Sequence, residues 1–472
     1  MYDSALKSDQ SMPTSAGHRI GVRYRRILKA IVSATFGKGA NLIIGAITVP
    51  ITVRYLGAEG YGLWMAISST VSMVIQFDIG IASTLTNLIS EAFVKKDKEL
   101  AAEYFTTALW IILGLVSLLG LAGWLVWPHV NWASLFHVST PLLVRQAPVA
   151  MAVAFIVFLG YLPSGLATRI LGGYQELHIA NYFGIAGSLL GLLSILVVVH
   201  FRLGLPVLVG SFAGSMLVVN AACLAWICFF HKPWMKPWPS RFRRAMTGSI
   251  FGSGSKFFLI QMANLIVWNS DNIVIAHFRG AAAVTPYSVT WKLVCYITAL
   301  QTLAVPALWP AYSEAYVRGD LPWIRKTYRR VRWATVALLT VGGLCAAFGG
   351  QSIIRLWAGP AAVPDIWTLR LMCVWMAVFA FALNQSTLLG ATARVGRQAV
   401  MSCIAAGVNL ALSILWVRPW GSVGVLLASI LSFVFLILSV QGLEVSHILR
   451  GDFLGLRSGV VEPPIIAEQE MP

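Results

Sequence analysis

Five charged side chains stand inside long apolar stretches of this 472-residue sequence: Lys38, Asp78, Lys256, Asp271 and Lys292. An ionisable side chain at the centre of a bilayer costs roughly 2.5–3.5 kcal/mol, so each must face an opposite charge, a polar group or water. Three lysines against two aspartates make such an interior mildly cationic, which favours an anionic ligand. The chemistry that these residues offer is therefore ligand binding.

Position along the chain indicates which of these charges could meet. Lys38 and Asp78 lie about 25–30 Å from the turn between them, at 1.5 Å per helical residue, and could pair across the first helical hairpin. Asp271 and Lys292 lie at a similar, shallower depth near the outer face and could pair across the hairpin of the seventh and eighth predicted helices. Both pairs could be structural salt bridges or parts of a wet cavity. Lys256 has no obvious acidic neighbour, so it is the best single candidate for an anion contact.

Motifs of catalysis and of cofactor binding are missing from the sequence. Gly37-Lys38-Gly39 lacks the Ser or Thr of a phosphate-binding loop, and neither a His-Glu-x-x-His nor a Gly-x-Ser-x-Gly pattern occurs. The six cysteines all fall in apolar stretches, where reduced packing residues are expected. We therefore expect no enzyme activity, no cofactor and no metal site.

Composition points to helices that cross a membrane. Apolar residues make up 58% of the sequence and charged residues 11%, whereas soluble domains carry about a quarter charged residues. The apolar blocks approach or exceed the roughly 20 residues that a helix needs to cross about 30 Å of hydrocarbon. We predict an all-α polytopic membrane protein with about twelve transmembrane helices, which start near residues 31, 61, 104, 147, 181, 207, 250, 284, 333, 367, 398 and 420.

Basic residues set the orientation of these helices, because Lys and Arg stay on the cytoplasmic side. With the N-terminus inside, roughly 25 of the 35 basic residues fall in cytoplasmic segments. We therefore expect both termini in the cytoplasm. The net charge of +17 then reflects loops that lie beside anionic membrane lipids, and no nucleic-acid partner is expected.

The sequence also repeats itself. Ala40-Asn41-Leu42-Ile43 recurs as Ala263-Asn264-Leu265-Ile266, and residues 90–97 recur as residues 313–320, at an offset of 223 residues in both cases. An even number of spans per copy predicts two parallel six-helix repeats around a central cavity, an architecture that transporters use. The predicted domains are a cytoplasmic tail (1–30), an N-terminal lobe (31–231), a basic linker (232–249), a C-terminal lobe (250–444) and a second cytoplasmic tail (445–472).

The repeat extends the set of candidate cavity residues. The same offset takes Lys38 to Gln261 and Asp78 to Gln301, so that polar residues stand at equivalent depths in both halves. The predicted substrate-binding candidates are Lys38, Asn41, Asp78, Lys256, Gln261, Asn264, Asp271, Lys292 and Gln301.

One motif resembles a known family. The run from Arg54 to Trp64, Arg-Tyr-Leu-Gly-Ala-Glu-Gly-Tyr-Gly-Leu-Trp, followed by Asp78-Ile79-Gly80, is similar to the N-terminal signature of O-antigen (Wzx-like) polysaccharide flippases. These share a superfamily with multidrug exporters of the MATE type and with lipid II flippases. The resemblance implies a bacterial inner-membrane protein that flips an oligosaccharide on polyprenyl diphosphate by alternating access. A polysaccharide polymerase or export complex is a possible partner.

Other functions stay open at this point. An ion-coupled multidrug exporter of the same superfamily is the first alternative, although a cation exporter should show an excess of acidic residues. A membrane-embedded glycosyltransferase or polymerase is the second, but the longest external loop, from Trp127 to Gln146, carries no acidic residue. A major facilitator transporter should carry a Gly-x-x-x-Asp motif where residues 93–98 read Phe-Val-Lys-Lys-Asp-Lys.

Overall fold

The predicted all-α fold is confirmed. A computed structural model of the protein describes residues 15–75, 81–248, 267, 269–392 and 396–450. In these ranges the regular elements are helices throughout. Nine of the described helices are long and apolar enough to cross a membrane. The chain is therefore a multi-pass membrane protein.

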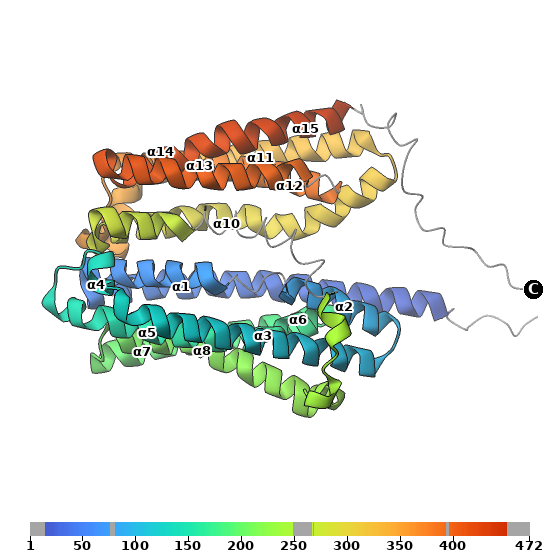
Figure 1. Ribbon diagram of the computed structural model, residues 1–472. Coiled ribbons are helices and arrows are strands. Elements are labelled where there is room, and N and C mark those ends of the chain that lie inside the picture. The colour runs from blue at the N-terminus through green and yellow to red at the C-terminus, as the bar shows by residue number, and fades with distance from the viewer. Residues whose placement is uncertain (1–14, 76–80, 249–266, 268, 393–395, 451–472) are drawn as a thin grey trace, which may run out of the picture.

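The first half of the chain contains eight of the labelled helices (Figure 1). They are α1 (Ser15–Ile75), α2 (Ile81–Val94), α3 (Lys98–Val126), α4 (Trp132–Leu135), α5 (Pro141–Ser164), α6 (Leu166–Gly173), α7 (Leu177–Phe201) and α8 (Leu205–Trp226). A π-helical segment, Ile227–His231, extends α8. The helix α1 begins inside the predicted tail and contains the first predicted span and the beginning of the second, joined across a non-helical Gly57.

The second half follows the same order of long helices. Residues 269–279 are helical, and then come α10 (Ala281–Val317), α11 (Leu321–Trp357), α12 (Ile366–Ala391), α13 (Gly396–Trp420), α14 (Ser422–Ser432) and α15 (Ser439–Arg450). Figure 1 shows α1–α8 and the helices from α10 onward as two groups, which we call the N-terminal and C-terminal bundles. The bundles meet where α1 packs along α10.

The two predicted repeat copies form the same turn. Lys96 after α2 (φ 57°) and Gly319 after α10 (φ 74°) both have left-handed backbone conformations. Asp97 and Asp320, which follow them, each accept a hydrogen bond from a backbone N–H in the first turn of the next helix. The backbone hydrogen bond that closes the turn is 3.0 Å long in the first copy and 2.9 Å in the second. The duplication read from the sequence is thus a duplication of structure.

A second pair of equivalent turns lies at the opposite end of the helices. Gly57 has φ 68° and ψ 179°, and Gly280 has φ 85° and ψ 159°. This region of φ/ψ space is essentially restricted to glycine. We call this end of the protein the Gly57 end, and the end that carries Asp97 and Asp320 the Asp97 end. Figure 1 shows α4 at the first and α2 at the second.

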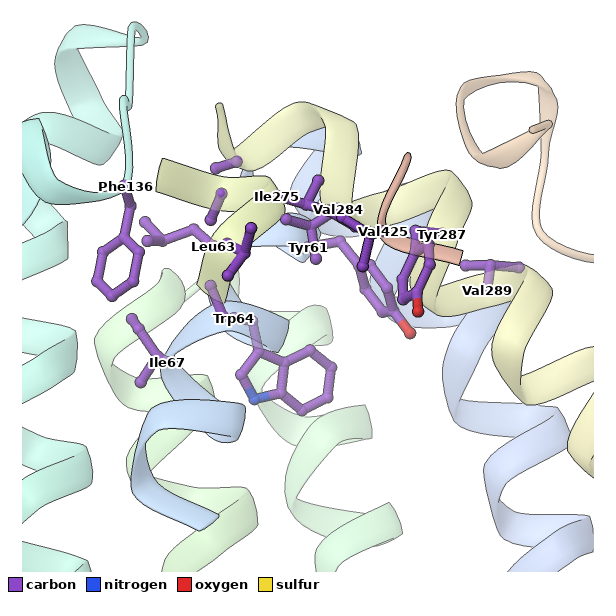
Figure 2. Packing of buried hydrophobic residues seen from close by; sticks show 14 of the residues in the cluster. Tyr61, Leu63, Trp64, Ile67, Phe136, Ile275, Val284, Tyr287, Val289 and Val425 are labelled. Carbon is purple, nitrogen blue, oxygen red and sulfur yellow. The ribbon is translucent and has the colours of Figure 1, made fainter. Parts of the chain in front are cut away.

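Hydrophobic packing differs between these two ends. At the Gly57 end, one cluster contains buried residues of both bundles, including Tyr61 and Leu63 from α1 and Val284 and Tyr287 from α10. Figure 2 shows these side chains together with Phe136, which caps α4. At the Asp97 end, the N-terminal bundle has its own cluster from α2, α3, α5, α6 and α8, and the C-terminal bundle has another from α10, α11, α12 and α15. Among the residues that the structure describes, the bundles share a hydrophobic cluster at the Gly57 end and have separate clusters at the Asp97 end.

The described part of the predicted linker packs on the N-terminal bundle. It forms short 3-10 turns at Pro233–Met235, Pro239–Arg241 and Arg244–Met246. Lys232 lies 3.1 Å from a carboxylate oxygen of Glu176, and Arg243 lies 2.7 Å from one of Glu103. Ion pairs therefore hold this basic segment against the N-terminal bundle.

Replacement of Gly57 by Ala should destabilise the protein through the backbone alone. A Cβ at Gly57 would meet nothing within 4 Å, so the cost comes from the φ of 68°. We expect the free energy of unfolding to fall by about 1–3 kcal/mol, measured by thermal unfolding in detergent followed by circular dichroism. Gly114→Ala is the matched control, because this glycine is helical and also in open space. Equal midpoints of thermal unfolding for the two variants would contradict backbone strain at position 57.

Candidate functional site

Asp271 and Lys292 lie at the Gly57 end, in the C-terminal bundle beside α1. Asp271 is 6% exposed, and one of its carboxylate oxygens accepts a hydrogen bond of 2.6 Å from the hydroxyl of Tyr287. The ammonium group of Lys292 donates to the hydroxyl of Tyr61 at 2.9 Å and lies 5.4 Å from the centre of its ring. Of the two interpretations of this pair, the salt bridge is wrong, since the described residues show no ion pair between Asp271 and Lys292.

Helical geometry explains why these two charges do not pair. Tyr287 lies five residues before Lys292 on α10, which is about 7.5 Å along the helix axis. The tyrosine is thus the side chain that stands level with Asp271, and the lysine reaches across to α1. Tyrosine hydroxyls take the positions that opposite charges were expected to fill.

The two charged residues nevertheless face a common space. A cavity of about 90 Å³ is lined by Met65, Val267, Asp271, Asn272, Tyr287, Ser288, Trp291 and Lys292. The second carboxylate oxygen of Asp271 is buried and has no hydrogen-bond partner among the described residues. A buried polar atom of this kind is costly unless water or a ligand completes it. In Figure 2 the hydroxyl groups of Tyr61 and Tyr287 point in the same direction.

Hydrogen bonds between the bundles gather around this cavity. The hydroxyl of Thr285 donates to the backbone carbonyl of Ala58 at 2.5 Å. The side-chain amide of Asn272 donates to the hydroxyl of Ser69 at 2.9 Å. These bonds join α10 and the preceding helix to the part of α1 that follows Gly57. The polar contacts thus reinforce the shared hydrophobic cluster.

The backbones themselves touch at Gly62. A Cβ placed on this residue would lie 1.7 Å from the carbonyl oxygen of Ala281. Only glycine fits at such a distance, because any other side chain would overlap with backbone atoms that cannot rotate away. This contact brings the start of α10 against α1 at the Gly57 end.

The loop before α5 covers the same end of the protein. The carboxylate of Glu59 accepts hydrogen bonds from the backbone N–H groups of Ser139 and Thr140 and from both hydroxyls. At the end of α4, where this loop begins, the carbonyl oxygen of Leu135 lies 3.0 Å from Nδ1 of His277 in the C-terminal bundle. Glu59 thus holds a loop that bridges the two bundles.

Three other candidate residues lie away from this cluster. Lys38 is exposed, and its ammonium group donates to the backbone carbonyl of Thr302 across the bundle interface at 3.1 Å. Asn41 is also exposed. Gln301 is 8% exposed and donates within its own bundle to the backbone of Ala380 and to Asn384. The Gln301 amide is therefore hydrogen-bonded inside the C-terminal bundle, whereas Lys38 and Asn41 are exposed on α1.

The remaining candidates, Asp78, Lys256, Gln261 and Asn264, lie outside the described residues. The proposed pairing of Lys38 with Asp78 and the unpaired state of Lys256 thus stay predictions. The structure adds Glu59, Tyr61, Gly62, Tyr287 and Thr285 to the site. A signal for three of them existed in the sequence, since Glu59, Tyr61 and Gly62 lie in the run that resembles the flippase signature.

The sequence is similar to proteins of polysaccharide biosynthesis and O-antigen transport. The family model described as polysaccharide biosynthesis protein matches residues 27–316. A protein of Salmonella typhi named putative O-antigen transporter is 25% identical over 312 residues, which cover 65% of this chain and 70% of that protein. A protein of the same name from Salmonella typhimurium is 21% identical over 286 residues, which cover 58% of this chain and 62% of that one.

Solved structures show the same fold. An inward-facing multidrug resistance MATE family transporter of the MOP superfamily aligns with a TM-score of 0.72 at 16% identity, over 89% of this chain and 99% of that one. An outward-facing structure of such a transporter gives 0.58 at 15% identity, over 90% and 96% of the two chains. A MOP superfamily transporter from Pyrococcus furiosus gives 0.59 at 14% identity, with the same coverage. The chain therefore shares the fold of these transporters.

Replacement of Gly62 by Ala should push the two bundles apart at the Gly57 end. The new methyl group overlaps with the Ala281 carbonyl, so we expect a loss of about 1–3 kcal/mol of stability and a wider distance between α1 and α10. Spin labels at positions 54 and 282 would report this distance by pulsed electron resonance, after replacement of the exposed Cys345 and Cys403 by Ser. Gly39→Ala, in open space on the same helix, should change neither quantity. Unchanged label distances in the Gly62 variant would refute the contact.

Proposed function

The chain belongs to the polysaccharide biosynthesis protein family, and we propose that it flips a lipid-linked oligosaccharide across a bacterial cytoplasmic membrane. The cargo in this proposal is an oligosaccharide on polyprenyl diphosphate, which is destined for a cell-surface polysaccharide. The relatives named putative O-antigen transporters support this class of cargo. A diphosphate headgroup also suits the cationic balance of the charged residues within the predicted spans.

The orientation in this proposal follows the basic residues. Lys95, Lys96, Arg318 and the basic linker stand at the Asp97 end, which we therefore assign to the cytoplasm together with both termini. The Gly57 end then faces the periplasm. The two lobes of the transporter are residues 31–231 and 250–444, with residues 232–249 as the cytoplasmic linker between them.

The mechanism in this proposal is alternating access, in which the two lobes rock about each other. One observation carries it: the bundles share a hydrophobic cluster at the Gly57 end, whereas each has its own cluster at the Asp97 end. A substrate cavity between the lobes would thus be closed toward the periplasm and accessible from the cytoplasm. Rocking would part Gly62 from Ala281 and bring the two cytoplasmic clusters together.

Lys38 fits the role of a headgroup contact in this state. It is exposed on α1, and its partner across the interface is a neutral carbonyl group that a diphosphate could outcompete. Lys256 is the corresponding candidate of the C-terminal lobe. An ammonium group that meets a phosphate makes a charge-assisted hydrogen bond, which is stronger than one to a carbonyl group.

The first test of the cargo is complementation of a bacterial strain that lacks its polysaccharide flippase. We expect Lys38→Ala and Lys256→Ala to reduce polymer export at least about tenfold at wild-type protein levels, because each removes a charged hydrogen bond. Lys95→Ala is the matched control, since Lys95 is an exposed cation that pairs with Glu91 in the turn after α2. Normal export by both lysine variants would reject the headgroup contacts.

The same strains separate the alternatives. Failure of the wild-type chain to restore any polymer, together with raised resistance to cationic drugs, would favour a multidrug exporter, whose fold the chain shares. Polymer synthesis without flipping, measured as labelled sugar incorporated in sealed inverted vesicles, would favour a membrane-embedded glycosyltransferase or polymerase. A physical association with a polymerase would show as co-purification.

Alternating access itself predicts reciprocal labelling of two positions. Asn41 is exposed, whereas Ser69 is 7% exposed at the bundle contact of the Gly57 end. With cysteine at either position, the lipid-linked substrate should slow thiol labelling of residue 41 and speed that of residue 69, each by about threefold or more. The measurement uses a membrane-impermeant maleimide on proteoliposomes. Rates that move in the same direction, or that do not move, would contradict rocking of the lobes.

A further inference from the structure

A cluster of five basic residues lies in the first turns of α11, in a place that the transport proposal does not use. These residues are Arg325, Lys326, Arg329, Arg330 and Arg332, and all are exposed. The stretch that follows, residues 334–354, carries no charged side chain and is long enough to cross about 30 Å. The cluster therefore stands where α11 leaves the hydrocarbon, at the depth of the lipid headgroups.

Four of these residues line one hollow in the surface. A cavity of about 350 Å³ is bordered by Pro322, Arg325, Lys326, Tyr328, Arg329 and Arg332 of α11 and by Leu449 of α15. We call it the α11 basic groove. Arg325, Arg329 and Arg332 are spaced at i, i+4 and i+7, which places them on one face of the helix. The guanidinium group of Arg325 also donates to the backbone carbonyl of Leu449, which fixes one wall of the groove.

Among the described residues, no carboxylate neutralises the positive charges of the groove. In the part of the chain that the structure describes, no acidic side chain forms an ion pair with any of the five basic residues. Glu444, the acidic residue of α15, lies 3.9 Å from Arg397 instead. Like charges around one cavity repel each other, and an anion with several oxygens relieves that repulsion. The groove thus matches a phosphate group in charge and in donor number.

The surroundings favour a lipid as the source of this phosphate. Trp323 and Trp333, which flank the basic cluster, are 38% and 60% exposed. Exposed tryptophans concentrate at the interface between headgroups and hydrocarbon. Directly below the groove, the apolar surface of residues 334–354 offers a path for acyl chains. A soluble anion would use the arginines but would gain nothing from this apolar surface.

We propose that the α11 basic groove binds the phosphate of an anionic phospholipid, with Arg329 and Arg332 as its main contacts. The proposal depends on the membrane-spanning fold alone and stands whichever cargo the protein carries. Since α11 packs on α10 and α12, a lipid held between α11 and α15 stabilises the Asp97 end of the C-terminal bundle, whose core there is a small separate cluster. The membrane lipid is then a structural component of this bundle.

Native mass spectrometry of the full-length protein tests this proposal. The protein is equilibrated with equal amounts of phosphatidylglycerol and phosphatidylcholine, and the lipid retained on it is counted. We expect wild-type protein to retain phosphatidylglycerol in preference. R329Q/R332Q should weaken this retention about 25-fold, since each substitution replaces a charge-assisted hydrogen bond to the phosphate by a neutral one, at a cost of roughly a factor of five. Arg325 is left in place because it holds Leu449.

A matched control separates the groove from general attraction to basic residues. R244Q/R330Q removes two exposed cations at the same end of the protein, neither of which lines the groove. Its retention of phosphatidylglycerol should stay within about twofold of wild type, because exposed charges outside the groove act through screened solvent. Equal losses in the two double variants would overturn the proposal. R329K/R332K, which keeps the charge, should retain the lipid better than R329Q/R332Q.

The remaining outcomes are also decisive. If R329Q/R332Q does not fold, wild-type protein alone gives the answer, since equal retention of the two lipids would overturn the proposal. Stronger retention of undecaprenyl diphosphate than of phosphatidylglycerol, lost in R329Q/R332Q, would assign the groove to the prenyl diphosphate cargo and overturn the phospholipid. Displacement of phosphatidylglycerol by millimolar inorganic phosphate would overturn a lipid site in favour of a soluble anion. Failure of transport leaves each of these readouts intact.

Discussion

The approach of two backbones at Gly62 is the contact on which the closed end of this protein depends. Lipid tails are as apolar as the side chains of a transmembrane helix, so helices associate through close packing and hydrogen bonds rather than through hydrophobic burial. The absence of a side chain at Gly62 lets the Ala281 carbonyl come into direct contact with α1. Tyr61 and Tyr287 are buried beside this contact. The hydrogen bond from Thr285 to the carbonyl of Ala58 lies beside it and joins the same two helices.

The two halves of the chain repeat the same turns, but the two ends of the described bundle interface pack differently. The turns are alike in both halves, from the left-handed residue before each aspartate to the length of the closing hydrogen bond. The difference between the two ends therefore arises in the packing between bundles. One hydrophobic cluster is shared by both bundles at the Gly57 end, and each bundle has a separate cluster at the Asp97 end. In the proposed alternating access, this difference in packing would let the bundles rock, because packed cores switch between arrangements and do not deform continuously.

Polar chemistry at the interface is arranged around tyrosine rather than around ion pairs. Lys292 donates to Tyr61 in the other bundle, and Asp271 accepts from Tyr287 within its own. A hydroxyl partner keeps a charged group hydrogen-bonded at a lower cost of separation than an opposite charge would. In the proposed rocking of the lobes, the bond between Lys292 and Tyr61 would break as the bundles part, while the Asp271 carboxylate would keep its partner. The basic groove of α11 lies at the opposite end and leaves this network untouched.

The sequence by itself determined the helical membrane fold, the parallel repeat and the family, because apolar length, the 223-residue offset and the run from Arg54 to Trp64 are local patterns. It also placed Asp271 and Lys292 near one another. It could not decide their hydrogen-bond partners, since Tyr287 and Lys292 are only five residues apart on one helix and the sequence does not show which of them faces Asp271. Which helix faces which, and hence the contact of Gly62 with Ala281 and the groove between α11 and α15, was decided only by the tertiary structure. Such contacts join residues far apart in the chain, and no spacing rule encodes them.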